Sequence, residues 1–220
     1  QRQMCIRDST RIEQSVRAVE EEVWAPAPVV PALTALVAQL CRAADDASEY
    51  VVTRRLGREA PAADAAADAS ARTLALGEQS YFVVRATETS IKLLNDYVRL
   101  VANLPMFAAE TLSWIVEFLK QFNSRTCQVV LGAGAMRSAG LKNITARHLA
   151  LASQSLSLMI ALQQPLRVLL RKHLTASQSV LLNEFDKLER DFREHQFEIH
   201  SKLVAIMADR CLLYTSPSPR

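Results

Sequence analysis

The chain has 220 residues, of which 50% are hydrophobic and 22% are charged, and this balance excludes an intrinsically disordered protein. Its net charge of +3 is small and carries no cluster of Lys or Arg, which argues against nucleic acid as the main partner. Only five glycines are present, and no uninterrupted apolar stretch is long enough to span a membrane, so the composition favours a helical protein without membrane spans.

The two ends of the chain are related through their codons. Met4 to Ser9 can be encoded by ATG-TGT-ATA-AGA-GAC-AG and one further base, and the reverse complement of this string, read one base in, encodes Cys211 to Ser216. The pair resembles the transposase end sequence used to prepare sequencing libraries. We therefore expect residues 1–9 and 211–220 to be adapter-derived and non-native. Without them the net charge falls from +3 to +1.

Residues 10–42 are predicted to form two short helices. Prolines between residues 26 and 31 separate the two. The first helix has apolar residues three or four positions apart, at Ile12, Val16, Val19 and Val23. Residues 43–72 then lose this periodicity, and their Ala- and Asp-rich composition indicates a flexible linker.

A small β-hairpin is expected next, at residues 73–84. Two short strand-like runs flank Gly77, which supplies the turn. From residue 85 to residue 210 the pattern is helical throughout. The first helix runs from Arg85 to Asn103, the second begins near Phe107, and the third has Thr145 as its N-cap. Short connections between such helices predict antiparallel neighbours.

The fourth helix is expected to open at Thr175 to Gln178, which have the spacing of a capping box. It carries the clearest apolar seam of the chain, with His195 in line. The seam residues are Leu181, Phe185, Leu188, Phe192, Ile199, Leu203 and Ile206. The predicted fold class is therefore all-α: an elongated antiparallel helical bundle, truncated at its C-terminal end, with a small β-hairpin before it.

Alternating charges occupy the same helix between Asp186 and Glu194. They favour a solvated helix face. The alternative is that they select the partner in a coiled coil.

Residues 129–136 look like the beginning of a dinucleotide-binding loop, in which glycines let backbone N–H groups approach a pyrophosphate. However, Arg137 occupies the third glycine position, and the preceding segment is predicted to be a helix rather than a strand. We therefore interpret Gly132, Ala133, Gly134 and Ala135 as small residues at which neighbouring helices approach closely. A nucleotide-dependent enzyme that uses Gly132 and Gly134 remains the less favoured alternative.

The other candidates for chemistry are four histidines and two internal cysteines. His195 and His200 are five residues apart and no Glu completes a metal-binding helix motif, so no metal site is expected. Cys41 and Cys127 lie far apart in the sequence and are interpreted as reduced core residues. No nucleophile lies in a catalytic context. The sequence therefore predicts no catalytic residue and no cofactor, and hence a protein that is not an enzyme.

The chain resembles a known family at several blocks. Residues 118–135 read FLKQFNSRTCQVVLGAGA, and further blocks follow at 140–145, 148–151, 185–186 and 201–207. These blocks are similar to the C-terminal part of the vacuolar protein sorting-associated protein 54 family. The likeness covers about residues 17–210, with the largest departures at 43–72 and 163–172.

This resemblance implies a subunit of the Golgi-associated retrograde protein (GARP) tethering complex, which captures endosome-derived vesicles at the trans-Golgi network. It implies binding to the other tether subunits, with SNAREs and small GTPases as further partners. It also implies peripheral membrane association at the cytosolic face of the trans-Golgi network and endosomes, and a chain that continues into further helices. A generic helical scaffold or coiled-coil adaptor is the alternative function.

Overall fold

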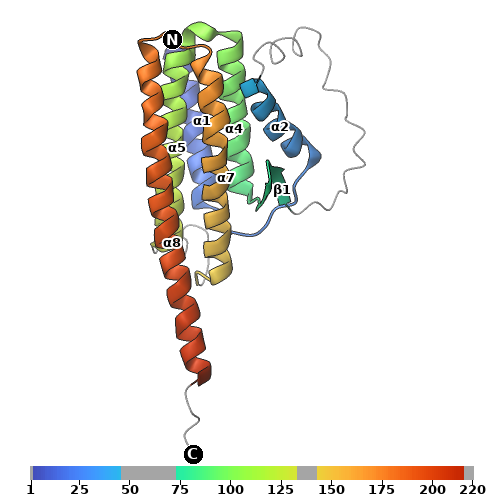
Figure 1. Ribbon diagram of the computed structural model, residues 1–220, viewed down its shortest axis with the longest axis vertical. Coiled ribbons are helices and arrows are strands. Elements are labelled where there is room, and N and C mark those ends of the chain that lie inside the picture. The colour runs from blue at the N-terminus through green and yellow to red at the C-terminus, as the bar shows by residue number, and fades with distance from the viewer. Residues whose placement is uncertain (1, 46–72, 133–142, 216–220) are drawn as a thin grey trace, which may run out of the picture.

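Helices dominate the computed structural model, which describes residues 2–45, 73–132 and 143–215. Helices α1, α4, α5, α7 and α8 lie side by side as a bundle, and α2 lies with a small hairpin on one flank (Figure 1). The predicted all-α class with a β-hairpin is confirmed. The bounds are α1 Arg2–Glu20, α2 Pro31–Asp45, β1 Thr73–Leu76, β2 Gln79–Phe82, α4 Arg85–Asn103, α5 Ala108–Leu131, α7 Ala146–Arg171 and α8 Glu184–Thr215, with short 3₁₀ helices η1 Pro105–Phe107 and η2 Gln178–Asn183.

Helix α1 belongs to the bundle, which is therefore not confined to residues 85–210. It packs against α4 and α5, while α2 packs against α4 and α7. Val19 and Ile12 are buried in the same core as the later helices. Helix α1 begins at Arg2 and α8 ends at Thr215, so both helices run into the segments expected to be adapter-derived. Of the linker expected at 43–72, residues 43–45 form the end of α2, and 46–72 lie outside the described part of the chain.

The hairpin predicted at 73–84 is present. Strands β1 and β2 pair antiparallel, with Leu74 opposite Tyr81 and Leu76 opposite Gln79. Gly77 begins the two-residue loop and has a φ of 61°, a value that glycine adopts without a steric penalty. Leu74 and Tyr81 are both buried on the face that meets the helices. One face of the hairpin thereby extends the core of the bundle, with β1 in contact with α2 and β2 in contact with α7.

Helix α7 begins with the N-cap predicted at Thr145. The Thr145 backbone N–H donates to Nδ1 of His148 at 3.3 Å, and the Thr145 side chain accepts from the backbone N–H of His148, so the two residues form a capping box. Glu or Gln usually fills this position. Burial, followed by the neighbouring Arg147 charge, lowers the pKa of His148.

The fourth helix begins later than predicted. Thr175 and Gln178 do form reciprocal hydrogen bonds, from Thr175 N to Gln178 Oε1 at 3.1 Å and from Gln178 N to Thr175 Oγ1 at 3.4 Å. This box opens the 3₁₀ helix η2, however, and α8 begins only at Glu184. A 3₁₀ helix has three residues per turn instead of 3.6, so the register of buried positions shifts before α8 begins.

This shift corrects the first position of the apolar seam. Leu181 is 39% exposed, whereas the next residue, Leu182, is 1% exposed and packs in the core. The seam prediction is therefore wrong at Leu181. From Phe185 onward the α-helical spacing applies, and the buried seam residues are Phe185, Leu188, Phe192 and Ile199, with Leu203 and Ile206 half-buried.

The core is contributed by all the bundle helices. Trp24, Tyr97, Phe118, Phe122 and Phe192 are among its largest fully buried side chains. The two internal cysteines are free thiols, of which Cys127 is buried and Cys41 half-buried. Within the described ranges, none of the helices combines the length and the apolar character needed to cross a membrane.

Candidate interaction surface

Gly132 ends α5 and does not lie between helices. Its backbone N–H donates to the carbonyl oxygen of Gln128 at 3.1 Å, after which the backbone turns to an extended conformation. A Cβ at this position would lie 2.6 Å from that same oxygen. Gly132 is exposed, so the helix-packing prediction is wrong for it, while Ala133, Gly134 and Ala135 lie outside the described residues. Because an α-helix precedes Gly132, the strand required by a dinucleotide-binding loop is missing here.

The exposed end of α5 is capped by a residue of α8. Nζ of Lys202 donates to the carbonyl oxygen of Leu131 at 3.0 Å and approaches that of Val130 at 3.5 Å. The last carbonyls of a helix have no partner within the helix and carry partial negative charge, which a lysine ammonium neutralises. Lys202 therefore attaches the C-terminal half of α8 to the end of α5.

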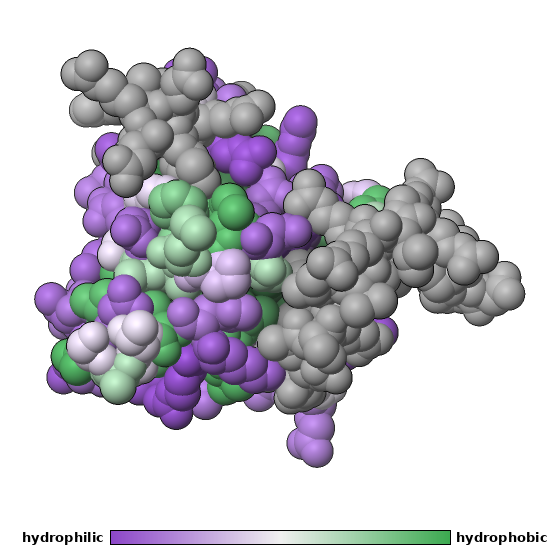
Figure 2. All heavy atoms as spheres, turned by 90° about the horizontal axis from the view of Figure 1, so that it is seen from above, coloured by the Kyte–Doolittle hydropathy of each residue, from purple (hydrophilic) through white to green (hydrophobic). Residues whose placement is uncertain are grey.

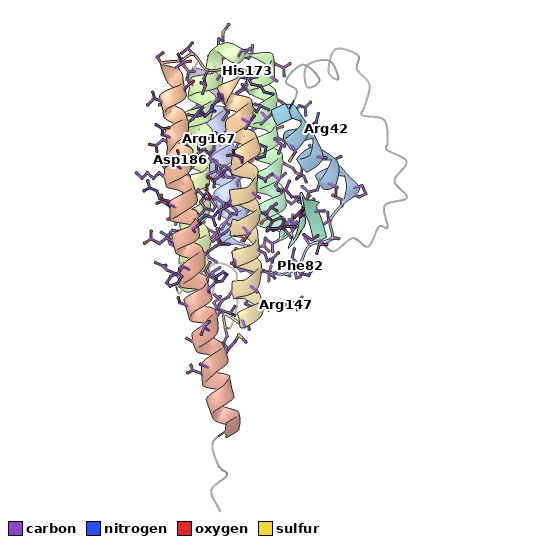
Figure 3. The ribbon with its side chains drawn as sticks, viewed as in Figure 1. Arg42, Phe82, Arg147, Arg167, His173 and Asp186 are labelled. Carbon is purple, nitrogen blue, oxygen red and sulfur yellow. The ribbon has the colours of Figure 1, made fainter. Side chains whose placement is uncertain are left out.

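Polar contacts also join α8 to α7. The Gln196 amide donates to the Ser153 carbonyl at 3.0 Å and to Oγ of Ser157 at 2.6 Å. Nε2 of His200 lies 2.7 Å from Oγ of Ser153. Near the other end of the interface, Arg167 and Asp186 form an ion pair through both guanidinium amino groups, and Figure 3 shows these two side chains on neighbouring helices. The charged residues of α8 thus form a solvated face, and one of them, Asp186, also connects α8 to α7.

Beyond Gln196, α8 exposes apolar side chains to solvent. Phe197 is 73% exposed, Val204 64% and Met207 57%. Successive members are seven and three residues apart, so they follow the helix axis beside the core seam. Figure 1 shows that the C-terminal part of α8 continues past the ends of its neighbours. We call Phe197, Val204 and Met207 the α8 stripe. The α8 stripe was not predicted from the sequence, although the helical spacing of its three residues could have indicated it.

A second exposed apolar area lies at the opposite end of the bundle. It comes from two connections, with Leu104 and Met106 between α4 and α5, and Val180 and Leu181 ahead of α8. Met106 is 78% exposed. Figure 2, seen from this end, shows hydrophobic residues at the surface with hydrophilic residues beside them. Apolar side chains exposed together on a folded protein commonly mark an interaction site.

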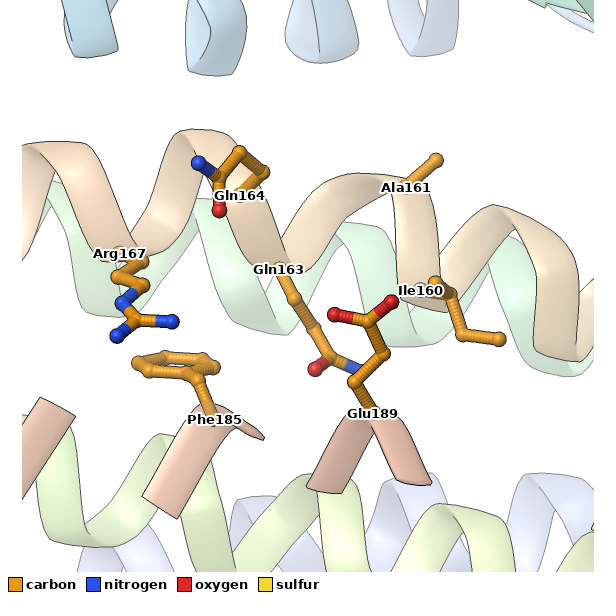
Figure 4. A pocket seen from close by; sticks show the side chains of 7 residues that line it. All are labelled: Ile160, Ala161, Gln163, Gln164, Arg167, Phe185 and Glu189. Carbon is orange, nitrogen blue, oxygen red and sulfur yellow. The ribbon is translucent and has the colours of Figure 1, made fainter. Parts of the chain in front are cut away.

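A pocket of about 270 Å³ opens between α7 and α8. Figure 4 shows the side chains of Gln163 and Arg167 from α7 and of Phe185 and Glu189 from α8 around it. Gln163 is 4% exposed, and neither polar atom of its amide has a hydrogen-bond partner among the residues that the structure describes. The charged side chains are already paired, since Arg167 binds Asp186 and Glu189 binds Arg193. The pocket therefore offers a buried amide but no free charge.

Two of the four histidines form hydrogen bonds that hold the fold together. His148 caps α7 and His200 binds Ser153. Burial, reinforced by the nearby Glu198 charge, raises the pKa of the Cys127 thiol to about 12, so this thiol stays protonated at neutral pH. Among the described side chains, no three His, Cys, Asp or Glu residues are placed to hold a metal ion. What the surface offers is apolar side chains and hydrogen-bonding groups, which suit binding to other proteins.

The chain is similar to several known proteins. The chain is 40% identical over 141 residues to vacuolar protein sorting-associated protein 54, chloroplastic, of Arabidopsis thaliana, and this match spans 64% of the chain and 14% of the relative. It is 33% identical over 207 residues to vacuolar protein sorting-associated protein 54 of Schizosaccharomyces pombe, spanning 90% of the chain and 21% of the relative. The Homo sapiens protein of the same name is 39% identical over 137 residues, spanning 62% and 14%.

The chain thus spans about a fifth or less of the length of these relatives. No solved structure matches it. Residues 78–210 match the family model described as Vps54-like protein. The matched residues comprise β2, the helices α4, α5 and α7, and α8 as far as residue 210. The chain therefore belongs to the Vps54-like protein family.

Proposed function

We propose that this chain is a helical segment of a vesicle-tethering subunit that acts in retrograde transport from endosomes to the trans-Golgi network. The observation that carries the proposal is the family match over residues 78–210. The proposed complex is the GARP tether, and the proposed mode of action is protein–protein binding. The other tether subunits are the primary partners, with SNAREs and small GTPases as further ones. The proposed location is the cytosolic face of the trans-Golgi network and endosomes, with peripheral membrane association through partners.

The surface of α8 supports a binding role. The α8 stripe exposes three large apolar side chains on a helix that Lys202 and Gln196 hold against α5 and α7. An anchored helix loses little conformational freedom when a partner packs onto it, which favours binding. The relatives are several times longer than this chain. We therefore propose that a helix from the remainder of the same subunit packs onto the α8 stripe.

Affinity purification of the full-length parent protein tests the proposed function. Recovery of the other tether subunits, together with enrichment in trans-Golgi membrane fractions, is the expected result. Depletion of the parent is expected to leave recycling receptors in endosomes. A parent that recovers no tether subunit and sediments with the cytoskeleton would instead be a generic scaffold or coiled-coil adaptor.

A further inference from the structure

The first turn of α1 lies at the end of the bundle where α4 stops and α5 begins. At the opposite end, Glu22, just past α1, binds the backbone N–H of Ala86 in the first turn of α4. Glu20, the last residue of α1, pairs with Arg125 in the C-terminal part of α5 at 3.4 Å. Helix α1 is therefore antiparallel to α4 and parallel to α5, and Figure 1 marks the N-terminus at the end where α4 and α5 are joined.

The connection between α4 and α5 lies directly beside this start of α1. Helix α1 packs against both helices, and η1 joins the two. Three consecutive apolar side chains are exposed here, namely Leu104, Pro105 and Met106. Met106 is 78% exposed. Such a run on the surface of a folded domain indicates a binding site.

The same connection is a well-defined turn without basic residues. The Leu104 N–H donates to the Leu100 carbonyl at 2.8 Å, and the Phe107 N–H donates to the Leu104 carbonyl at 3.0 Å. Pro105 also restricts the backbone. A turn held in this way loses little conformational freedom when a partner packs onto it. Residues 103–110 contain no Lys or Arg to attract an anionic membrane. The turn therefore favours an apolar protein surface as its partner.

The parent protein supplies a segment at this place. The chain matches only 14% of the Arabidopsis thaliana relative and 21% of the Schizosaccharomyces pombe relative. It corresponds to the C-terminal part of the family, so the parent continues ahead of Thr10. Helix α1 leads this preceding chain directly past η1. We propose that the native segment preceding Thr10 continues α1 beyond the end of the bundle and packs an apolar face against Leu104 and Met106.

This contact differs from the one assigned to the α8 stripe, which lies at the opposite end of the bundle. It depends on the family to which the chain belongs and on the position of α1, and not on the tether role. A failure to recover tether subunits would therefore leave it unaffected.

Oxidation of methionine to its sulfoxide by hydrogen peroxide, followed by mass spectrometry, tests the proposal. The proteins compared are the 220-residue chain, the full-length parent, and the parent truncated after Arg210. We expect Met106 to be oxidised at least about fivefold more slowly in both longer proteins than in the 220-residue chain. Met159, which is 0% exposed in the core, is the control and should react slowly in all three.

Three results would overturn the proposal. The first is equal oxidation of Met106 in all three proteins. The second is protection in the full-length parent but not in the truncated one, which would assign the surface to the chain after residue 210. The third is protection in the 220-residue chain that grows with its concentration, which would assign the surface to a second copy.

A pair of variants provides an independent readout. Met106→Lys places a charge on the proposed contact, and Val23→Lys does so at a position that is 56% exposed beyond the other end of α1. Neither should lower the thermal midpoint of the 220-residue chain by more than about 2 °C. In the full-length parent, Met106→Lys should speed chymotrypsin cleavage ahead of Thr10 at least about fivefold, and Val23→Lys should not. Equal cleavage rates in the two variants would contradict the contact.

Discussion

The carboxylate of Glu22 accepts a hydrogen bond of 2.7 Å from the backbone N–H of Ala86, which lies 64 residues further along the chain. Its other oxygen accepts from the backbone N–H of Trp24 at 3.2 Å, where the chain adopts a positive φ of 52°. Ala86 is in the first turn of α4, whose own N-cap residue, Val84, has no side chain able to cap it. Glu22 therefore supplies the N-terminal cap of α4 from the end of α1.

The pH dependence of stability should report on Glu22. Burial raises the pKa of Glu22 above its ordinary value of 4.5, outweighing the hydrogen bonds from Ala86 and Trp24 and the Arg85 charge, which lower it. The folded chain then holds this proton more tightly than the unfolded chain. The stabilising contribution is complete below the ordinary pKa and is lost as pH rises through the folded-state pKa.

Urea unfolding of the chain and of Glu22→Gln measures this contribution, at pH values from below the ordinary pKa of Glu22 to above its folded-state pKa. The difference in free energy of unfolding between the two proteins should be largest in acid and should shrink as pH rises. A difference that grows with pH would mean that the ionised carboxylate is the preferred form in the folded state. Glu21→Gln is the matched control, since Glu21 is exposed.

Replacing Lys202 by Met should loosen the C-terminal half of α8. The change removes the hydrogen bond to the Leu131 carbonyl and leaves the end of α5 uncapped, at a cost of about 1 kcal/mol. Hydrogen exchange should become faster at residues 199–206. Lys187→Met, at an exposed position of the same helix, should change stability by less than about 0.5 kcal/mol. Equal effects of the two substitutions would argue against the cap.

Two adjacent leucines should differ sharply when each is replaced by Ala. Leu182 is 1% exposed, so Leu182→Ala should destabilise the chain by about 2–5 kcal/mol through lost burial and a new cavity. Leu181 is 39% exposed, and Leu181→Ala should cost less than about 0.5 kcal/mol. Thermal or urea unfolding gives both values. If Leu181→Ala were the more destabilising change, Leu181 would be the buried residue, and the register shift at η2 would be contradicted.

The α8 stripe should bind hydrophobic dye in the 220-residue chain. Phe197→Gln with Val204→Gln should reduce dye fluorescence and self-association while leaving the thermal midpoint within about 2 °C, because both side chains are exposed. Phe185→Ala, in the buried seam, should instead destabilise by about 3–5 kcal/mol. Met106→Gln tests the other apolar end. A dye signal that depends on Met106 alone would remove the stripe as the binding surface.

Residues 1–9 and 211–220 should be dispensable. The motive is the reverse-complement relation between the codons of Met4–Ser9 and Cys211–Ser216. Deleting both segments should change the thermal midpoint by no more than about 2 °C, since terminal segments contribute little to stability unless they are packed. A large fall measured by calorimetry would show that these segments are packed parts of the fold.

Local sequence patterns were sufficient to predict many of the secondary-structure elements of this protein. The bounds of α4 at Arg85 and Asn103, the Thr145 cap and the hairpin turn at Gly77 could all be predicted, because each depends on residues within about four positions of one another. The same holds for the seam from Phe185 to Ile199, where regular α-helical spacing places every member on one face.

Only the tertiary structure decided the rest. The Glu22–Ala86 and Lys202–Leu131 contacts join residues 64 and 71 positions apart, and nothing in their local sequence marks them as partners. That Asn123 of α5 and His195 of α8 line the same pocket depends on how the two helices are aligned. Whether Leu181 or Leu182 is buried depends on η2, which forms where the chain turns from α7 into α8. Periodicity specifies which side of a helix is apolar. Packing specifies which neighbouring helix that side contacts, and at which position along the helix axis.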